Sequence, residues 1–301
     1  MRGGALLLVA AAAAAAGCRP PLDDRPWLVT TLEILGVTAD PPEVAPGSAV
    51  TMEIVALDPT FAADPAATAW TWCRAPKPLG ENRVVASDCL TPAAVDTVGS
   101  PVTLAIPGDA CEVFGPNTPQ PAPGAPPTRP RDPDPTGGYF QPVTTVLGDV
   151  TAVALERIAC GLPDASLAIA RAYQAAYHPN QNPHIAGLTL TVDGAPVDPT
   201  AVPPGARVTI EVSWPADTAE SFPVFDRAAN TLVDTREVLT ASWYVTGGSL
   251  DRAAASVDDP SLLSTSTTWT APPTPTSSEI LVLLRDSRGG ADAQRATLQV
   301  N

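Results

Sequence analysis

Few side chains in this sequence could transfer a proton at neutral pH. Only 2 His occur among the 301 residues, and His178 and His184 flank the segment Pro-Asn-Gln-Asn-Pro at residues 179–183. The GxSxG, HExxH and glycine-rich phosphate-loop motifs do not occur in the sequence, so the usual nucleophile, zinc and phosphate chemistry has no matching residues. Carboxylate pairs such as Asp258 and Asp259 lie in acidic, turn-rich segments, where such side chains are mostly solvated. The sequence therefore predicts a protein that is not an enzyme and holds no cofactor or metal ion.

The Asn-rich segment between the two histidines has one alternative use. Asn180-Gln-Asn-Pro183 is similar to the Asn-rich linkers between cadherin repeats, and that similarity implies oxygen ligands for calcium. Asp193 and Asp286 are carboxylates that could complete such a site. Asn also tolerates unusual backbone angles, so we expect a stiff interdomain turn and keep calcium as the alternative.

The cysteines predict disulfide chemistry. The sequence has 5 Cys, and setting aside Cys18 leaves an even set of four, Cys73, Cys89, Cys111 and Cys160. No CxxC pair occurs and both histidines lie outside this set, which disfavours zinc and favours two disulfides in an oxidising compartment. We expect Cys73–Cys89 and Cys111–Cys160, with the nested pairing Cys73–Cys160 and Cys89–Cys111 as the alternative.

The N-terminus predicts export. Residues 1–18 read MRGGALLLVAAAAAAAGC, with a cation at Arg2 and an apolar run too short for a comfortable membrane span. The small residues before Cys18 resemble the lipobox of bacterial lipoproteins, although Ala15 stands where Leu is usual. That resemblance implies a signal peptide at 1–17 and a diacylated Cys18 at the mature N-terminus. The competing hypotheses are an ordinary signal peptide cut nearby and an uncleaved anchor.

The lipoprotein resemblance also implies a location. Arg19 rather than Asp follows Cys18, which in the enterobacterial sorting pattern indicates the outer membrane, and palmitate is a typical acyl group of this class. Residues 18–27 are polar and Pro-rich, so we expect them to form a tether between the lipid and the first domain.

Composition limits the fold and the partners. A formal charge of −15 and a pI near 4.4 disfavour nucleic acid, because phosphate binding needs a basic surface. The 36 Pro argue against an all-helical protein. The length is sufficient for two domains that each bury a core.

A repeat in the mature chain supports two copies of one domain. Pro46-Gly47 followed by Val50-Thr51 and Glu53 matches Pro204-Gly205 followed by Val208-Thr209 and Glu211. Trp-bearing segments at 68–73 and 240–245 follow, and then longer apolar segments at 152–158 and 280–285. The alternation of apolar and polar residues at 208–212 predicts strands.

The pattern resembles bacterial immunoglobulin-like domains related to PKD and cadherin-like modules, most clearly through residues 242–248 and 284–290. The resemblance implies an all-β fold of two tandem immunoglobulin-like antiparallel β-sandwich domains. We place the first domain at 28–178, a linker at 179–184 and the second domain at 185–301. We expect Trp70 or Trp72, and Trp243, to be core anchors.

Three segments depart from the repeat. Residues 115–135 hold nine Pro and predict a mobile loop in the first domain. Residues 215–238 contain Phe222 and Phe225, which we expect to pack over their own domain, or alternatively to offer a small apolar contact. Residues 166–177 fit either a strand or a helix, and we predict a strand because their place matches the last strand of the second copy.

These observations predict a non-catalytic, membrane-anchored surface or periplasmic lipoprotein, working as a scaffold, spacer or adhesion module with two sandwiches in series. The alternative is a ligand-binding lipoprotein that uses the loops at the sandwich ends for a glycan or a protein partner. In both hypotheses the lipid anchor joins the chain to the membrane.

Overall fold

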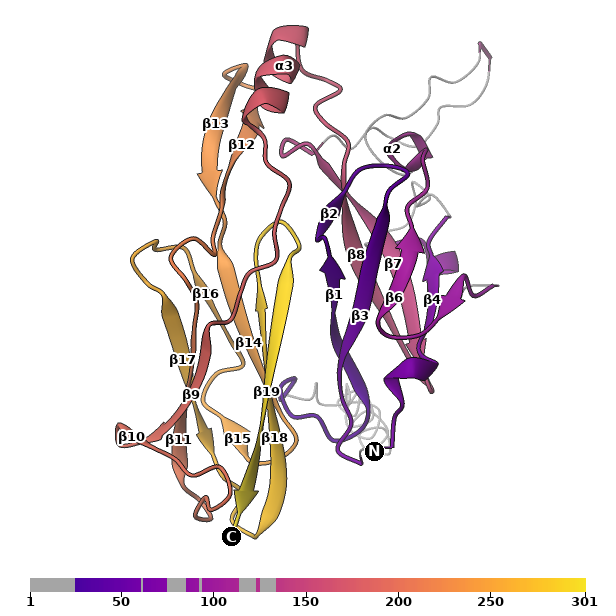
Figure 1. The fold of residues 1–301 in the computed structure, drawn as a ribbon. Coiled ribbons are helices and arrows are strands. Elements are labelled where there is room, and N and C mark those ends of the chain that lie inside the picture. Colours follow the sequence, from indigo (N-terminus) through magenta and orange to yellow (C-terminus); the bar gives the residue numbers. More distant parts are fainter. Residues whose placement is uncertain (1–24, 61, 75–84, 92–93, 114–122, 125–133) are drawn as a thin grey trace, which may run out of the picture.

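The computed structural model describes residues 25–60, 62–74, 85–91, 94–113, 123–124 and 134–301. The signal peptide, Cys18 and most of the Pro-rich segment at 115–135 lie outside the described residues. In the described part, no helix is long and apolar enough to cross a membrane. Two β-sandwiches make up most of the molecule (Figure 1), so the predicted fold class is confirmed.

The first domain stacks a three-stranded sheet on a five-stranded sheet. The first sheet has the order β1-β3-β6 and the second the order β2-β8-β7-β4-β5. All neighbours are antiparallel except the short parallel pair β2–β8. The strands are β1 (Glu33–Asp40), β2 (Glu43–Val44), β3 (Ala49–Leu57), β4 (Ala69–Trp72), β5 (Thr97–Val98), β6 (Val102–Ala105), β7 (Gly138–Leu147) and β8 (Val150–Ala159), with short helices η1 (Pro65–Ala67), η2 (Ser87–Leu90) and α2 (Ala110–Val113) between them.

The second domain repeats this plan. One sheet has the order β10-β9-β11-β17-β15 and the other β16-β14-β18-β19. The strands are β9 (Gly187–Val192), β10 (Ala195–Pro196), β11 (Arg207–Ser213), β14 (Leu239–Val245), β15 (Ser249–Leu250), β16 (Ala254–Val257), β17 (Ser264–Thr270), β18 (Thr276–Arg285) and β19 (Ala291–Val300), with the separate hairpin β12 (Ser221–Asp226) and β13 (Thr231–Arg236) between β11 and β14.

Alternating burial explains why the repeated segments form strands. In β11, Val208, Ile210 and Val212 are fully buried while the residues between them face outward. The Pro-Gly turn before each copy places its glycine at positive φ, 79° at Gly47 and 72° at Gly205, which glycine adopts without steric cost. Trp70, Trp72 and Trp243 are buried in the two cores, as the sequence predicts.

The sequence does not predict strand β7 of the first domain. The apolar segment 152–158 lies in β8, which corresponds to β19, whereas the counterpart of β18 is β7. Pro142 argues against a strand at the position of β7, because Pro is rare in central strands. Here its backbone faces the end of β4, and its carbonyl accepts a hydrogen bond from the Cys73 N–H at 3.0 Å.

The prediction of a strand at residues 166–177 is wrong. Residues Leu167–Ala176 form the helix α3, whose N-terminus is capped by the Ser166 hydroxyl, which accepts from the Ile169 N–H at 3.3 Å. The last strand position is already filled by β8, so this segment is free to follow its helical spacing. Tyr173 of α3 packs on Phe225 of β12.

The insertion at 215–238 contacts the connection between the domains. Phe225 packs against α3, while Phe222 lies under the guanidinium of Arg288 at 4.7 Å from the ring centroid. The two phenylalanines do not cover their own sandwich as expected. They belong to the β12–β13 hairpin, which lies at one end of the molecule (Figure 1).

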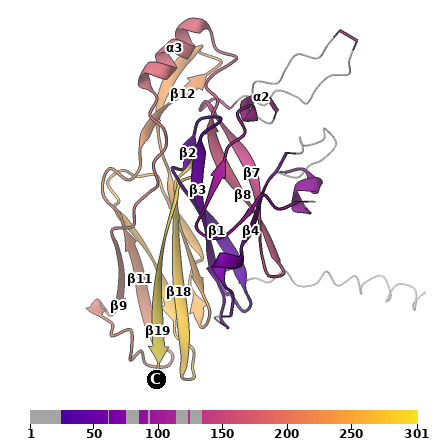
Figure 2. The same cartoon turned by 45° about the vertical axis from the view of Figure 1, so that its right-hand side comes forward.

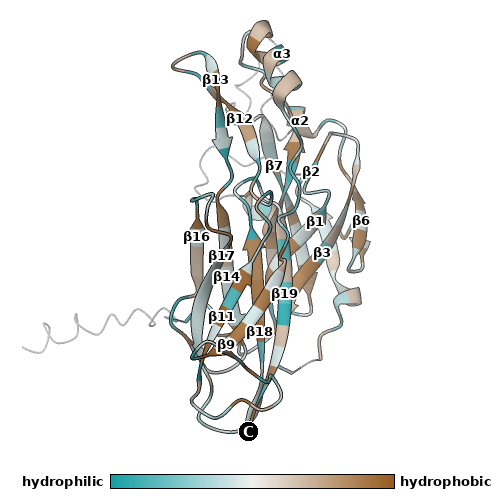
Figure 3. Ribbon diagram, turned by 60° about the vertical axis from the view of Figure 1, so that its left-hand side comes forward, coloured by the Kyte–Doolittle hydropathy of each residue, from teal (hydrophilic) through white to brown (hydrophobic). Residues whose placement is uncertain are grey.

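The two sandwiches lie side by side, which corrects the arrangement in series (Figures 1 and 2). Leu281 and Leu283 of β18 form an apolar cluster with Val55 and Leu57 of β3. The residues between them, Ile280, Val282 and Leu284, face the core of the second domain. Strand β18 is thus buried on both faces, and Figure 3 shows hydrophobic residues along β3 and β18. Four sheets are stacked as one body.

The N-terminal segment is fastened to the second domain by backbone hydrogen bonds, and its Val29 side chain is buried in the apolar cluster between the domains. The backbone of Val245 at the end of β14 accepts from the Val29 N–H and donates to the Trp27 carbonyl, both at 2.9 Å. The Trp27 side chain is part of the second domain's core cluster. We call residues 27–29 the strap; it spans the predicted boundary between the tether and the first domain.

The four remaining cysteines form two disulfides. Cys73 is joined to Cys89, and Cys111 to Cys160, with Cα–Cα distances of 5.2 and 5.6 Å. This is the pairing that the sequence analysis favoured over the nested one. Both disulfides lie in the first domain.

Candidate functional site

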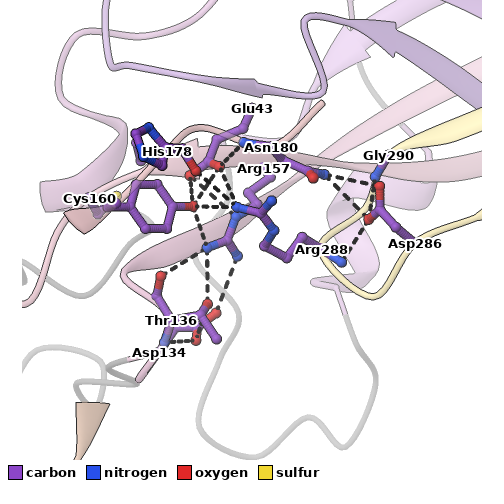
Figure 4. Close-up of polar contacts among 12 residues, drawn as sticks. Glu43, Asp134, Thr136, Arg157, Cys160, His178, Asn180, Asp286, Arg288 and Gly290 are labelled. Atoms are coloured by element: carbon purple, nitrogen blue, oxygen red, sulfur yellow. Dashed lines mark hydrogen bonds and ion pairs between the residues drawn. The ribbon is translucent and has the colours of Figure 1, made fainter. Parts of the chain in front are cut away.

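The most concentrated group of buried charges lies where the two domains meet. It is built from β2 and β8 of the first domain, the connection after α3, the β18–β19 turn of the second domain (Figure 4), and the residues that flank the β12–β13 hairpin. We call this group the joint network. Its central residues are Glu43, Arg157, Tyr177, Asn180, Glu220, Glu237, Asp286 and Arg288.

Glu43 is the acceptor at the centre of the joint network. The two-residue strand β2 pairs in parallel with β8 and places Glu43 beside Arg157, whose Nε lies 3.3 Å from Glu43 Oε1. The carboxylate also accepts from the Tyr177 hydroxyl at 2.6–2.7 Å and from the Asn180 N–H at 2.8 Å. Its side chain is fully buried, so these partners replace the water that a charged carboxylate would otherwise need.

Arg157 connects this centre to the segment before β7. Its Nη2 donates to the Thr136 carbonyl at 3.1 Å and to the Tyr177 hydroxyl at 3.2 Å. The guanidinium lies directly over Gly138, where an added Cβ would come within 2.2 Å of it. Glycine is therefore required at this position for Arg157 to reach the joint.

Arg288 is the second cation and comes from the other domain. Its Nε and Nη2 donate to Glu237 Oε1 and Glu220 Oε2, both at 2.6 Å. Its Nη1 donates to the His178 carbonyl at 3.1 Å and lies 4.0 Å from Glu43 Oε2. With 2% of its side chain exposed, Arg288 joins the second domain to both the connection and the first domain.

The β18–β19 turn holds Arg288 in place. Asp286 Oδ1 accepts from the Arg288 N–H at 2.8 Å and from the Gly290 N–H at 3.0 Å, and the Asn180 amide donates to the same carboxylate at 3.3 Å. A Cβ at Gly290 would lie 2.2 Å from Asp286 Oδ2. The turn thus needs glycine at 290 to close around its own carboxylate.

Carboxylates outnumber guanidinium groups in the joint network. Burial, with a smaller contribution from the neighbouring Asp286, raises the pKa of Glu237 to about 7 against the lowering effect of its interactions with the Glu220 N–H and Arg288. Burial also raises the pKa of Asp286. Both shifts favour the neutral carboxyl groups, which lowers the cost of burying the surplus negative charge between the domains.

The structure does not bring together the residues expected to bind calcium. Asn180 donates its amide to Asp286, while Asp193 lies in the β9–β10 turn at the other end of the second domain (Figure 1). Among the described residues, no group of three or more His, Cys, Asp or Glu side chains could hold a metal ion. His178 contributes its backbone carbonyl to Arg288, and the exposed His184 lies 3.7 Å from Asp292.

A second buried carboxyl group lies inside the first domain. Glu156 on β8 pairs in register with Gln141 on β7 and shares the inward face of β8 with Ile158. It is 1% exposed, and its Oε1 has no hydrogen-bond partner among the described residues. Burial raises the pKa of Glu156 to about 9, with a smaller contribution from Glu43. The group is neutral in the folded protein at pH 7.

The sequence indicates Asn180 and Asp286 only as alternative calcium ligands, and it does not predict Glu43, Arg157 or Arg288 as site residues. One signal was present: Arg157 interrupts the apolar segment 152–158, where a charge in a buried strand needs a partner. Glu43 gives no such signal, because its partners are 114 or more residues away along the chain.

The fold and the joint define a protein of two tandem immunoglobulin-like sandwiches locked side by side. No family model matches the sequence, and no curated protein matches it. The chain is similar to Escherichia coli alpha-2-macroglobulin activated by porcine elastase, with 10% identity over 91% of this chain and 22% of that chain and a TM-score of 0.24. It thus spans about a fifth of that protein's length.

Two further solved structures show the same level of likeness. The Yersinia pseudotuberculosis adhesin InvE has 9% identity over 89% of this chain and 60% of that chain, with a TM-score of 0.20. Domains 4 and 5 of the S-layer protein SbsC have 11% identity over 90% of this chain and 98% of that chain, with a TM-score of 0.19. These scores are too low to support a conclusion about function.

Removing the Arg288 guanidinium should destabilise the protein strongly. Arg288→Met leaves Glu237 and Glu220 without their cation, and breaking a buried ion pair from one side costs about 3–5 kcal/mol. The matched control is Arg207→Met, which breaks the exposed pair with Asp251 (2.8 Å) and should cost less than about 1 kcal/mol. Urea unfolding measures both. Equal losses would contradict a structural role for the joint network.

Replacing Glu156 should change how stability depends on pH. Its pKa is about 9 when folded against 4.5 ordinarily, so between these values the folded state holds one more proton than the unfolded state. The free energy of unfolding should therefore fall by about 1.4 kcal/mol per pH unit from this group as pH rises.

Glu156→Gln removes that contribution. The variant and the wild type should have similar stabilities near pH 4.5, and the variant should become progressively more stable than the wild type toward pH 9. Glu53→Gln, on the exposed side of β3, is the control and should keep the wild-type slope. Urea unfolding at a series of pH values measures this, and parallel curves for Glu156→Gln and the wild type would refute the assignment.

Proposed function

We propose that this chain is a lipid-anchored bacterial lipoprotein of the outer membrane, exported through its signal peptide and lipidated at Cys18. It acts without catalysis, as a rigid surface or periplasmic module that contacts another macromolecule. The observation that carries the proposal is the strap, because it fixes the chain a few residues after Cys18 to the body of the molecule.

The strap limits how far the body can move from an anchor at Cys18. The described chain begins at Arg25, and the 7 residue-to-residue steps from Cys18 to Arg25 (25 − 18) span at most about 25 Å when fully extended. Trp27 is held in the core of the second domain. An anchored molecule would therefore stay close to the membrane surface, with its N-terminal end facing the bilayer.

The opposite end of the molecule is the part presented to partners. Helix α3 and the β12–β13 hairpin lie at one end of the molecule, and the indigo start of the described chain lies toward the other (Figure 1). The apolar layer and the joint network hold this end in a fixed orientation relative to the strap. Rigid presentation lowers the entropy lost on binding, which suits a scaffold or adhesion module.

Charge and residue chemistry favour contact with protein or glycan rather than nucleic acid. The formal charge is −15, which repels polyanions and tolerates basic partners. The buried charged groups of the joint network already have partners within the chain. They support the domain arrangement.

Substituting Cys18 tests the anchor. Cys18→Ala should move the exported protein from the detergent phase to the aqueous phase in a Triton X-114 partition and abolish labelling with a palmitate analogue. The control Ala15→Leu restores the usual lipobox residue and should keep both properties. If Cys18→Ala remains in the detergent phase and is processed normally, the lipoprotein assignment is wrong.

A further inference from the structure

The outer edge of strand β13 is a strand edge without a partner strand in the described part of the chain. β13 pairs only with β12, and the hairpin stands apart from both sandwiches at the end away from the strap (Figures 1 and 3). Such an edge exposes backbone N–H and C=O groups that can pair with another strand.

Hydrogen bonds on the inner side identify which residues face this edge. Phe225 on β12 donates its N–H away from β13, to the Pro135 carbonyl at 2.8 Å, and Glu237 donates toward β12, to the Glu220 carbonyl at 2.9 Å. Backbone groups in an antiparallel pair alternate in direction. Asp234 and Arg236 therefore direct their N–H and C=O groups outward.

These two residues make the edge complementary to itself. When two β13 strands pair antiparallel with Thr235 at the centre, Asp234 of each copy lies opposite Arg236 of the other, and all four side chains are on one face. Asp234 is exposed. Arg236 uses Nη2 for the Ala216 carbonyl at 3.2 Å, and its guanidinium has further donors. Opposite charges across a strand pair stabilise it.

Exposed apolar side chains lie near the β13 edge. Leu262 and Leu263 are 52% and 40% exposed, and Val233, on the face of β13 opposite to Asp234 and Arg236, is 47% exposed. Both leucines line a shallow pocket together with Arg236 at the base of the hairpin. Leu262 and Leu263 thus lie beside the C-terminal end of β13, within reach of a strand that pairs with this edge.

We propose that β13 is a homophilic docking edge whose partner is β13 of a second copy of this chain. Antiparallel pairing reverses the strand direction, and β13 lies along the length of the second domain (Figures 1 and 3). The N-terminal ends of the two copies then point in opposite directions. This deepens the proposed function and rests on it for the biological meaning: two anchored copies would connect two facing surfaces.

Sedimentation velocity of residues 19–301, the chain without its signal peptide and Cys18, tests the proposal, since this segment contains every described residue. We expect a monomer–dimer equilibrium with a dissociation constant on the order of 10–100 μM, because one strand edge is a small interface. A chain that stays monomeric up to roughly 1 mM would overturn the proposal, whatever the outcome of the Cys18 experiment.

Charge reversal identifies the edge. Asp234→Arg and Arg236→Asp each place like charges opposite each other and should weaken dimerisation about tenfold or more. Mixing the two variants should restore dimers, because the introduced Arg of one copy faces the introduced Asp of the other. Glu53→Arg, the same charge change on β3, should dimerise as the wild type does.

Each other outcome contradicts the proposal. Dimers that persist in both single variants would mean that another surface is used, and a mixture that stays monomeric would exclude this register. Unchanged circular dichroism and thermal midpoints for the two variants, whose side chains lie on the hairpin surface, exclude unfolding as the cause.

Discussion

The structure depends on the burial of β18 on both faces. Ile280, Val282 and Leu284 belong to the core of the second domain, while Leu281 and Leu283 belong to the layer between the domains. A strand with one solvated face would alternate apolar and polar residues, as β11 does. The uninterrupted apolar run is stable in water only when the first domain covers its outer face, so the second domain and the domain arrangement share one strand.

Apolar burial drives this contact but does not fix its geometry, because the hydrophobic effect is non-directional. Two features restrict the geometry. Gly36 on β1 lets the sheets approach, since a Cβ there would lie 2.8 Å from Leu283 Cδ2. The joint network then sets orientation, with Arg288 reaching Glu43 and the His178 carbonyl across the boundary. A buried ion network is weak as a source of stability and better suited to specifying one arrangement.

Much of the fold follows from local sequence. Alternation at 208–212, the Pro-Gly turns and the tryptophans predict the strands and cores because each reflects the surroundings of a few neighbouring residues. Strand β7 is not predicted, because Pro142 argues against a central strand. Only the structure shows that Pro142 lies beside the end of β4, where a missing N–H is tolerated. Helix α3 was misassigned because its apolar spacing fits both periods, and the choice depends on β8 already filling the last strand position.

The candidate site and the domain arrangement were less accessible from sequence. The run at 280–284 carried the signal for a doubly buried strand, but periodicity alone does not identify what covers the second face. The partners of Glu43 and Arg288 are brought together by two domains and a connection, so no spacing in the sequence reveals them. Trp27 gave no sign that it belongs to the second domain, because it lies beside the first in sequence.

Small-angle X-ray scattering of the mature chain, measured at concentrations low enough to keep it monomeric, tests the central claim that the apolar layer and the joint network hold the two sandwiches side by side. A compact body of this length has a radius of gyration of about 19 Å, and the pair-distance distribution should show one maximum. Leu283→Arg and Gly36→Val, which disturb the layer from opposite sides, should both increase the radius of gyration. A wild-type distribution with two separated maxima, typical of domains in series, would contradict the account.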